Sequence, residues 1–289
     1  MKPHLSFEPG LFQNNDRFGD PFFKRFKLRH PPQPIKLSDQ ISKNYLFPTF
    51  YADVACSIGI FHCDYDRAAS LMPHSAMRPV RMTLGRSLVL FSCYHYRNVL
   101  GVPPYCEIAM TIPVMVGDGA NPPVLPMIAS SHFSRFGYYV FSMPVTSKEN
   151  EIRGRTIWGL PKVTQEIEMH EEGGYCVTTA YESEGSPYFE LKVPLSGKTQ
   201  SFDVTGNLYS KHEGLLLKSQ TCFAGEFQVN KYMKLLWQRD AMPEKPFLKI
   251  GTGASARVLH FLKIEQHPFQ LRYTPSMNSC FDLGSPYEG

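Results

Sequence analysis

Lys162 lies in an unusual chemical setting, the stretch GRTIWGLPKVTQEIE at residues 154–168. Its neighbours Ile157, Leu160 and Val163 are apolar and cannot hydrate an ammonium group. Two interpretations are open. The lysine can extend from a loop, with its stem on apolar surface and its charge in water. Alternatively it is buried, so that the neutral amine, a nucleophile toward carbonyl carbon, is favoured.

A free amine of this kind can add to a carbonyl carbon. A protonated imine, once formed, accepts the electron pair of a breaking C–C or C–H bond. Such chemistry requires a proton carrier but no metal and no organic cofactor, so we expect none.

Six further side chains are candidates for binding a substrate, and Ser92 is one of them. Tyr94, His95 and Tyr96 could line a pocket, but alternate positions of a strand divide between core and solvent, which makes a catalytic His95 the less favoured interpretation. Arg155 can contact a substrate or pair with a carboxylate. Trp158 is expected to form a packed wall rather than a stacking platform.

The elements that must position these residues are predicted to be mostly strands. Runs rich in β-branched and aromatic residues predict strands at 51–64, 87–96, 105–116 and 135–145. The clearest hairpin joins 175–182 to 187–193 through SEGS, and a second hairpin is expected to bend at Gly206-Asn207.

Few helices are expected. The segment 64–73 begins with a capping Asp64 and ends at Pro73, which predicts one short helix. The segment 255–266 fits a helix or a strand. This composition of elements predicts a mostly antiparallel β domain, closed like a barrel so that strand edges are paired, with Lys162 on an internal surface.

Composition and charge exclude several functional classes. The 289 residues are 43% hydrophobic and 19% charged, enough apolar side chain for a sizeable core. The net charge of +4 is scattered, with its densest cluster at 24–30, so we expect no nucleic-acid partner. No apolar run approaches the ~20 residues of a membrane span. The N-terminus also lacks the apolar core of a signal peptide, so a cytoplasmic location without a membrane partner is expected.

The seven cysteines include no C-x-x-C pair, and they predict buried thiols rather than a zinc site.

Residues 1–45 carry PPQP and little periodicity, and they predict an N-terminal arm ahead of a single domain at 46–289. The apolar residues of this arm are too few to form their own core, so a partner subunit is one surface that could bury them, and a homo-oligomer is expected. They are Leu11, Phe12, Phe18, Phe22, Phe23 and Phe26.

The stretch around Lys162 resembles the active-site segment of the acetoacetate decarboxylase superfamily. In that family a Gly-Arg pair, an aromatic-Gly pair and Pro-Lys recur, and here they stand as Gly154-Arg155, Trp158-Gly159 and Pro161-Lys162. The stretch 105–114 is similar to the family segment that carries a catalytic glutamate, and 63–73 resembles an early family helix. Order and spacing agree over roughly residues 50–195.

This resemblance implies an α+β, mainly β fold with an acetoacetate-decarboxylase-like antiparallel barrel and a few short helices. It implies Lys162 as a Schiff-base nucleophile and Glu107 as an active-site carboxylate, in an oligomeric lyase that takes a small-molecule keto substrate. Glu107 can carry protons if partial burial raises its pKa, and its alternative role is a structural cross-strand ion pair. Decarboxylation, aldol-dehydration or cyclase chemistry by the same lysine, or a catalytically silent binding protein, all remain open, and a role in specialised metabolism would fit.

Three positions depart from the family pattern. Val163 replaces a second lysine, Ser92 stands near the place of a second glutamate, and Val54 stands near that of an arginine that faces the substrate carboxylate. Without the second lysine, hydrophobic burial has to lower the pKa of Lys162 largely alone.

Overall fold

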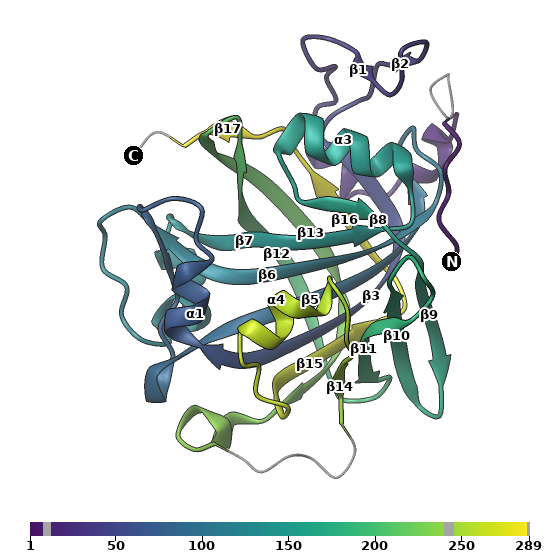
Figure 1. Cartoon of the computed structure of the whole chain (residues 1–289). Coiled ribbons are helices and arrows are strands. Elements are labelled where there is room, and N and C mark those ends of the chain that lie inside the picture. The colour runs from purple at the N-terminus through teal and green to yellow at the C-terminus, as the bar shows by residue number, and fades with distance from the viewer. Residues whose placement is uncertain (8–12, 240–245, 288–289) are drawn as a thin grey trace.

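Seven strands close into a barrel in the computed structural model, which describes residues 1–7, 13–239 and 246–287 (Figure 1). Around the barrel the order is β6, β5, β3, β15, β13, β12 and β7, and β7 pairs back with β6. The strands are β3 (Thr49–Asp64), β5 (Arg86–Val99), β6 (Tyr105–Val116), β7 (Phe136–Val145), β12 (Lys198–His212), β13 (Leu215–Lys231) and β15 (Pro268–Thr274).

Most neighbours in the barrel are antiparallel, as expected, whereas β7 and β12 pair in parallel. Shorter strands extend this sheet. β16 (Met277–Phe281) bridges β13 and β3, β8 (Lys162–Thr164) runs parallel to β7, and β4 (Met77–Pro79) and β17 (Ser285–Pro286) pair with β6 and β13. Closure of the sheet removes the free edges that a flat sheet would present.

A second sheet packs on the outside of the barrel through a large apolar cluster that includes Phe91 and Phe189. It contains β9 (Ile167–Glu172), β10 (Tyr175–Tyr181), β11 (Pro187–Pro194) and β14 (Leu248–Ile250). β10 and β11 form the hairpin predicted through SEGS.

The second predicted hairpin is real, but its bend was misplaced at Gly206-Asn207. β12 runs straight through both residues, which pair with Thr221 and Gln220 of β13. The chain reverses at Glu213-Gly214, where Gly214 has φ +85°, a conformation that costs glycine little.

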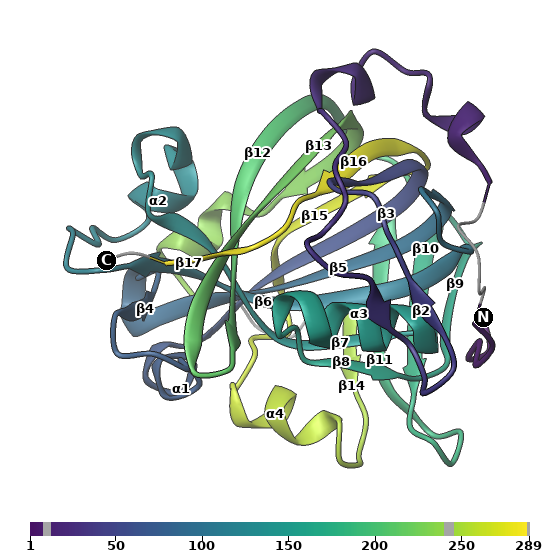
Figure 2. The ribbon, with the colours of Figure 1, turned by 90° about the horizontal axis from the view of Figure 1, so that it is seen from above.

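The helices are short and few. They are α1 (Tyr65–Ser70), α2 (Leu125–Ile128), α3 (Lys148–Trp158) and α4 (Ala256–Phe261), with 3-10 segments at Asn15–Phe18, Phe23–Arg25, Thr83–Gly85, Ser130–His132 and Met233–Leu236. Asp64 caps α1 by accepting a bond from the Arg67 amide at 3.0 Å, as predicted. The segment 255–266 contributes the helix α4. α3, which packs across β7, β8 and β12, was not predicted (Figures 1 and 2).

The N-terminal arm packs on the barrel of its own chain. Phe18, Phe22 and Phe23 are buried in a cluster with Phe50 of β3. Leu11 and Phe12 lie outside the described residues. The apolar residues of the arm were expected to be buried by a partner subunit. Because the same chain buries them instead, the expectation of an oligomer now rests on the family resemblance.

A second part of the arm, the small hairpin of β1 (Ile35–Lys36) and β2 (Ser42–Lys43), lies beside α3 (Figure 2).

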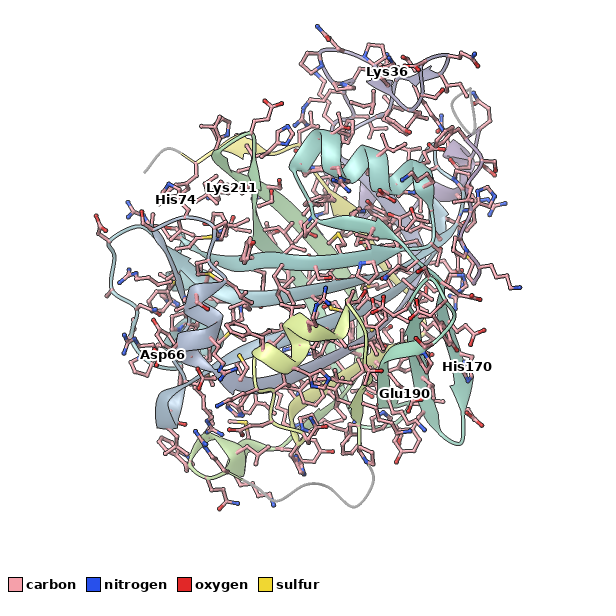
Figure 3. All side chains as sticks on the ribbon, in the orientation of Figure 1. Lys36, Asp66, His74, His170, Glu190 and Lys211 are labelled. Carbon is pink, nitrogen blue, oxygen red and sulfur yellow. The ribbon has the colours of Figure 1, made fainter. Side chains whose placement is uncertain are left out.

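Some of the titratable side chains lie on the outside of the molecule. Figure 3 labels Lys36 in the arm, Asp66 in α1 and His170 in β9, all of which lie toward the outside of the ribbon. All seven cysteines are free and buried. Among the described residues, no helix is long and apolar enough to cross a membrane, and no cluster of three or more metal-ligating side chains occurs.

Candidate active site

Lys162 and Glu107 form a buried ion pair. The Lys162 ammonium nitrogen Nζ lies 2.5 Å from Glu107 Oε2. Lys162 is 6% exposed and Glu107 5%, so water screens this contact little. The expectation of Lys162 on an internal surface is confirmed, and the two candidates chosen from separate sequence motifs meet at one point.

The end of α3 determines where Lys162 begins its strand. Gly159 caps the helix in the left-handed conformation, φ +61°, and its amide donates to Arg155 O at 3.1 Å. Pro161 cannot continue the helix. Lys162 then starts β8, in register with Met143 of β7, so that its side chain projects into the barrel beneath α3.

Gly154 makes room for the Lys162 side chain. A methyl group on Gly154 would lie 2.6 Å from Lys162 Cε and nearer still to Cδ, which is closer than real contacts allow. The aliphatic stem of Lys162 therefore crosses the helix where the helix has no side chain. This contact gives a physical reason for glycine in the Gly-Arg pair of the motif.

Glu107 is held among tyrosines. It lies near the start of β6, opposite Tyr94 of β5, and the Tyr96 hydroxyl donates to Glu107 Oε1 at 3.4 Å. The Tyr96 ring contacts those of Tyr51, Tyr94 and Tyr105, with centroids 4.5, 5.1 and 4.9 Å away. Burial raises the pKa of each of these four phenols, so all are neutral near pH 7 and can donate hydrogen bonds.

The pair opens onto a cavity of about 100 Å³, a volume suited to a small ligand. Its apolar wall is mostly aromatic and thioether. The lining residues are Tyr51, Tyr94, Tyr96, Ala109, Met143, Trp158, Leu160, Leu208, Phe223, Met277 and Phe281, with Glu107, Asn150, Arg153, Lys162, Thr221, Ser279 and Cys280 as polar members. Trp158 is fixed by its indole N–H, which donates to Asp282 O at 2.9 Å.

Burial lowers the pKa of Lys162, because the charged amine loses hydration. Glu107 opposes this shift by attraction and by its hydrogen bond, whereas the positive charge of Arg153 adds to the lowering. The net direction is downward, which raises the population of the nucleophilic free amine at a given pH.

Arg153 was missed by sequence reasoning. It lies on α3, is 1% exposed and lines the same cavity as Lys162. A charged residue in a polar stretch is normally solvent-exposed, so the sequence carried no signal for its burial. In the structure this arginine provides the cation that the missing second lysine does not. Val163, where that lysine would stand, is 50% exposed on the opposite side of β8.

The other predicted site residues divide between the cavity and its surroundings. Tyr94, Tyr96 and Trp158 line the cavity. Ser92 lies on the same strand but is not among the lining residues. His95 occupies an alternate position of β5 and does not line the cavity, and burial beside Arg97 lowers its pKa.

Arg155 is on the surface. Its side chain is 62% exposed, and Nη1 lies 3.7 Å from Glu151 Oε1. Four apolar residues lie near Lys162 in the sequence. Trp158 and Leu160 line the cavity, whereas Ile157 and Val163 do not.

Comparison with known families places this geometry in context. The model of the family "Acetoacetate decarboxylase (ADC)" matches residues 32–223 of the chain. This range contains both Lys162 and Glu107. No curated protein sequence gives a significant match.

Solved structures share the fold at low identity. An acetoacetate decarboxylase is 12% identical, with a TM-score of 0.56, over 89% of this chain and 91% of its own. The acetoacetate decarboxylase of Legionella pneumophila gives the same identity and TM-score over 94% of each chain. MppR, an enzyme of enduracididine biosynthesis solved with pyruvate, is 12% identical, with a TM-score of 0.55, over 82% of this chain and 89% of its own.

Proposed function

Because the chain belongs to the acetoacetate decarboxylase family, we propose that it is a Schiff-base lyase acting on a small keto acid, with Lys162 as the nucleophile. The observation that carries the proposal is the buried contact between Lys162 Nζ and Glu107 Oε2 in an aromatic cavity. A lysine activated by desolvation or by a neighbouring cation is the mechanism known from acetoacetate decarboxylase itself.

Glu107 moves protons during imine formation. The free amine of Lys162 adds to the substrate carbonyl carbon and loses one proton to Glu107, while the carbonyl oxygen takes up a proton from solvent and becomes the carbinolamine hydroxyl. Glu107 then returns its proton to that hydroxyl, which leaves as water. The resulting iminium carries the positive charge, so the Glu107 carboxylate next to it stabilises the intermediate.

The iminium then accepts an electron pair. In decarboxylation the pair comes from the bond between the α-carbon and a β-carboxylate, and CO₂ departs. In the second route it comes from an α C–H bond, and the proton goes to Glu107. Both routes give an enamine. After decarboxylation the enamine is protonated on carbon and hydrolysed, which releases the product and regenerates Lys162. After C–H cleavage the enamine carbon instead adds to a second carbonyl group, of another molecule or of the same substrate, and hydrolysis of the resulting imine regenerates Lys162.

The second route favours aldol-dehydration or cyclisation, and it is the second candidate function. A relative of the same fold, MppR, was solved with pyruvate, which has no β-carboxylate to lose. A catalytically silent binding protein is the remaining alternative. We propose a cytoplasmic enzyme that needs no cofactor for either route.

Reductive trapping tests the proposal. The protein is incubated with a β-diketone or with pyruvate, reduced with borohydride, and the adduct is located by mass spectrometry. We expect one adduct, on Lys162, that is lost in Lys162→Arg. Adducts spread over surface lysines, with Lys162 unmodified, would contradict the proposed chemistry and favour the alternative of a binding protein.

A further inference from the structure

Arg153 presents a buried guanidinium to the cavity. Nη2 donates to Thr49 Oγ1, and Nη1 donates to Asn150 Oδ1 at 3.4 Å. The group lies over the Tyr45 ring, with its central carbon 4.6 Å from the ring centroid. These contacts fix the plane of the guanidinium, and none of them is with an anion.

The positive charge of Arg153 has no anionic partner among the residues that the structure describes. Three acids lie on α3 or line the cavity, and each pairs with another cation: Glu107 with Lys162, Glu149 with Lys43, and Glu151 with Lys148. Glu149 also accepts from the Tyr45 hydroxyl. Arg153 Nε is buried and has no hydrogen-bond partner at all. An unpaired buried charge is costly, and a buried donor without an acceptor adds to that cost.

We propose that Arg153 binds the carboxylate of the substrate and thereby selects 2-oxo acids. Binding of the carboxylate depends only on the Arg153 guanidinium and the cavity. The effect of that binding on the reaction rests on the proposed function of Lys162. A carboxylate on Arg153 would neutralise the buried charge and occupy its free donor, in the charge-assisted geometry that arginine forms best.

Binding by Arg153 keeps this carboxylate in place. Decarboxylation turns an anionic carboxylate into neutral CO₂, so an arginine that stabilises the anion raises the barrier to its loss. The carboxylate held by Arg153 is therefore retained, and bond breaking occurs on the far side of the carbonyl.

A 2-oxo acid meets this condition. Its C1 carboxylate lies on Arg153, and its C2 carbonyl carbon forms the imine with Lys162. The electron pair released into the iminium then comes from a C3–H bond, whose proton passes to Glu107, or from a C3–carboxylate bond, which releases CO₂. The small cavity volume of about 100 Å³ also suits a short acid.

Pyruvate and pyruvamide provide the test, because they have the same shape and differ in charge. The concentration of each that gives half-maximal borohydride trapping at Lys162 is measured in the full chain. We expect pyruvate to be trapped at a concentration about 10-fold lower or more, on the scale of a charge-assisted hydrogen bond. The ketone carbon of pyruvamide is more electrophilic than that of pyruvate. Intrinsic reactivity alone would therefore favour trapping of pyruvamide, the opposite of the expected result.

Substitutions in α3 test whether Arg153 causes the difference between pyruvate and pyruvamide. Arg153→Gln is expected to raise the half-saturating concentration of pyruvate about 10- to 100-fold more than that of pyruvamide. Any rise in the pKa of Lys162 that follows from losing the positive charge affects both ligands alike, so the ratio of the two concentrations is the value that tests the contact. Arg153→Lys keeps the charge and is expected to be intermediate. The matched control is Arg155→Gln, two residues along the same helix and exposed, which should change neither value.

The outcomes separate the two proposals. Equal trapping of pyruvate and pyruvamide by the unaltered protein would overturn the role of Arg153 and leave the lysine chemistry standing. Trapping of neither would overturn the proposed function. In that case lactate tests the anion site alone, because lactate has a carboxylate but cannot form an imine. Its binding is measured by calorimetry. Binding that is weaker in Arg153→Lys supports the site, and no binding to the unaltered protein overturns it. The wild-type measurements decide even if Arg153→Gln fails to fold.

Discussion

At the scale of single residues, the chemistry of the site depends on three buried charged side chains, the paired Lys162 and Glu107 and also Arg153, which is unpaired among the described residues. Lys162 and Glu107 were identifiable from sequence, because each stands in a recognisable motif and is flanked by apolar residues. Arg153 was not, because it lies among polar residues that suggest an exposed face. A buried polar side chain leaves no mark in a hydrophobic pattern, and only the three-dimensional neighbours of α3 show that this one is enclosed.

Replacement of Glu107 separates proton transfer from nucleophilicity. Glu107→Gln should slow α-proton exchange of pyruvate in deuterated water by about 10²-fold or more, since a positioned general acid–base group contributes on that scale. Glu107 raises the pKa of Lys162, so its removal should lower that pKa further and move borohydride trapping to lower pH.

Proton NMR of the exchange, with circular dichroism to verify folding, checks the first effect. Exchange at the rate of the unaltered protein would make Glu107 a structural partner only.

At the scale of elements, β7 brings the two catalytic candidates together. Glu107 of β6 lies opposite Val145, and Lys162 of β8 lies opposite Met143. These two residues of β7 are two positions apart, so they share a face, and their partners on either side project into the same space. The strands themselves were predictable from their composition. The register that aligns them was not, because nothing local records it.

The Gly154 position tests whether α3 and Lys162 are fitted to each other. Gly154→Ala should move the Lys162 side chain, because the new methyl group would overlap its stem. Alanine normally stabilises a helix relative to glycine by about 1 kcal/mol, but overpacking a buried contact costs about 1–3 kcal/mol. We therefore expect a lower melting temperature and reduced trapping at Lys162.

Gly119→Ala is the matched control, since a methyl group there meets nothing within 4 Å. Unchanged trapping in Gly154→Ala would show that the lysine has another path into the cavity.

At the scale of the whole molecule, the N-terminal arm is joined to the barrel by a buried charge. Lys43 of the arm lies 2.8 Å from Glu149 of α3, with side-chain exposures of 1% and 2%. The sequence indicated an arm but not its contacts, because a pair of residues about a hundred positions apart is set by the folded chain alone. The same helix α3 thus carries Arg153 into the cavity and holds the arm.

Lys43→Ala should destabilise the fold by about 3–5 kcal/mol, the usual cost of removing one member of a buried ion pair. Urea unfolding measures this loss. Lys36→Ala is the control on the same arm, because its pair with Asp39 is 65% and 96% exposed and should be worth about 0.5 kcal/mol or less. Equal losses in the two variants would contradict the role of the arm contact.

Assembly is a prediction that belongs to this scale as well. The resemblance to the acetoacetate decarboxylase family implied an oligomer, and we expect this chain to form at least a dimer. Light scattering at micromolar concentration measures the mass directly. A species of 32.9 kDa, the mass of one chain, would contradict the expectation.

The pH dependence of imine formation at Lys162 tests the central claim most directly. The free amine is the reactive form, so trapping of a β-diketone should rise with pH and reach half its maximum at the pKa of Lys162. Burial and Arg153 lower that pKa, so we predict a midpoint below the ordinary lysine value of 10.5. Reaction of exposed lysines, read from the same mass spectra, provides the unshifted reference. A Lys162 midpoint at or above that reference would contradict an amine kept reactive by burial.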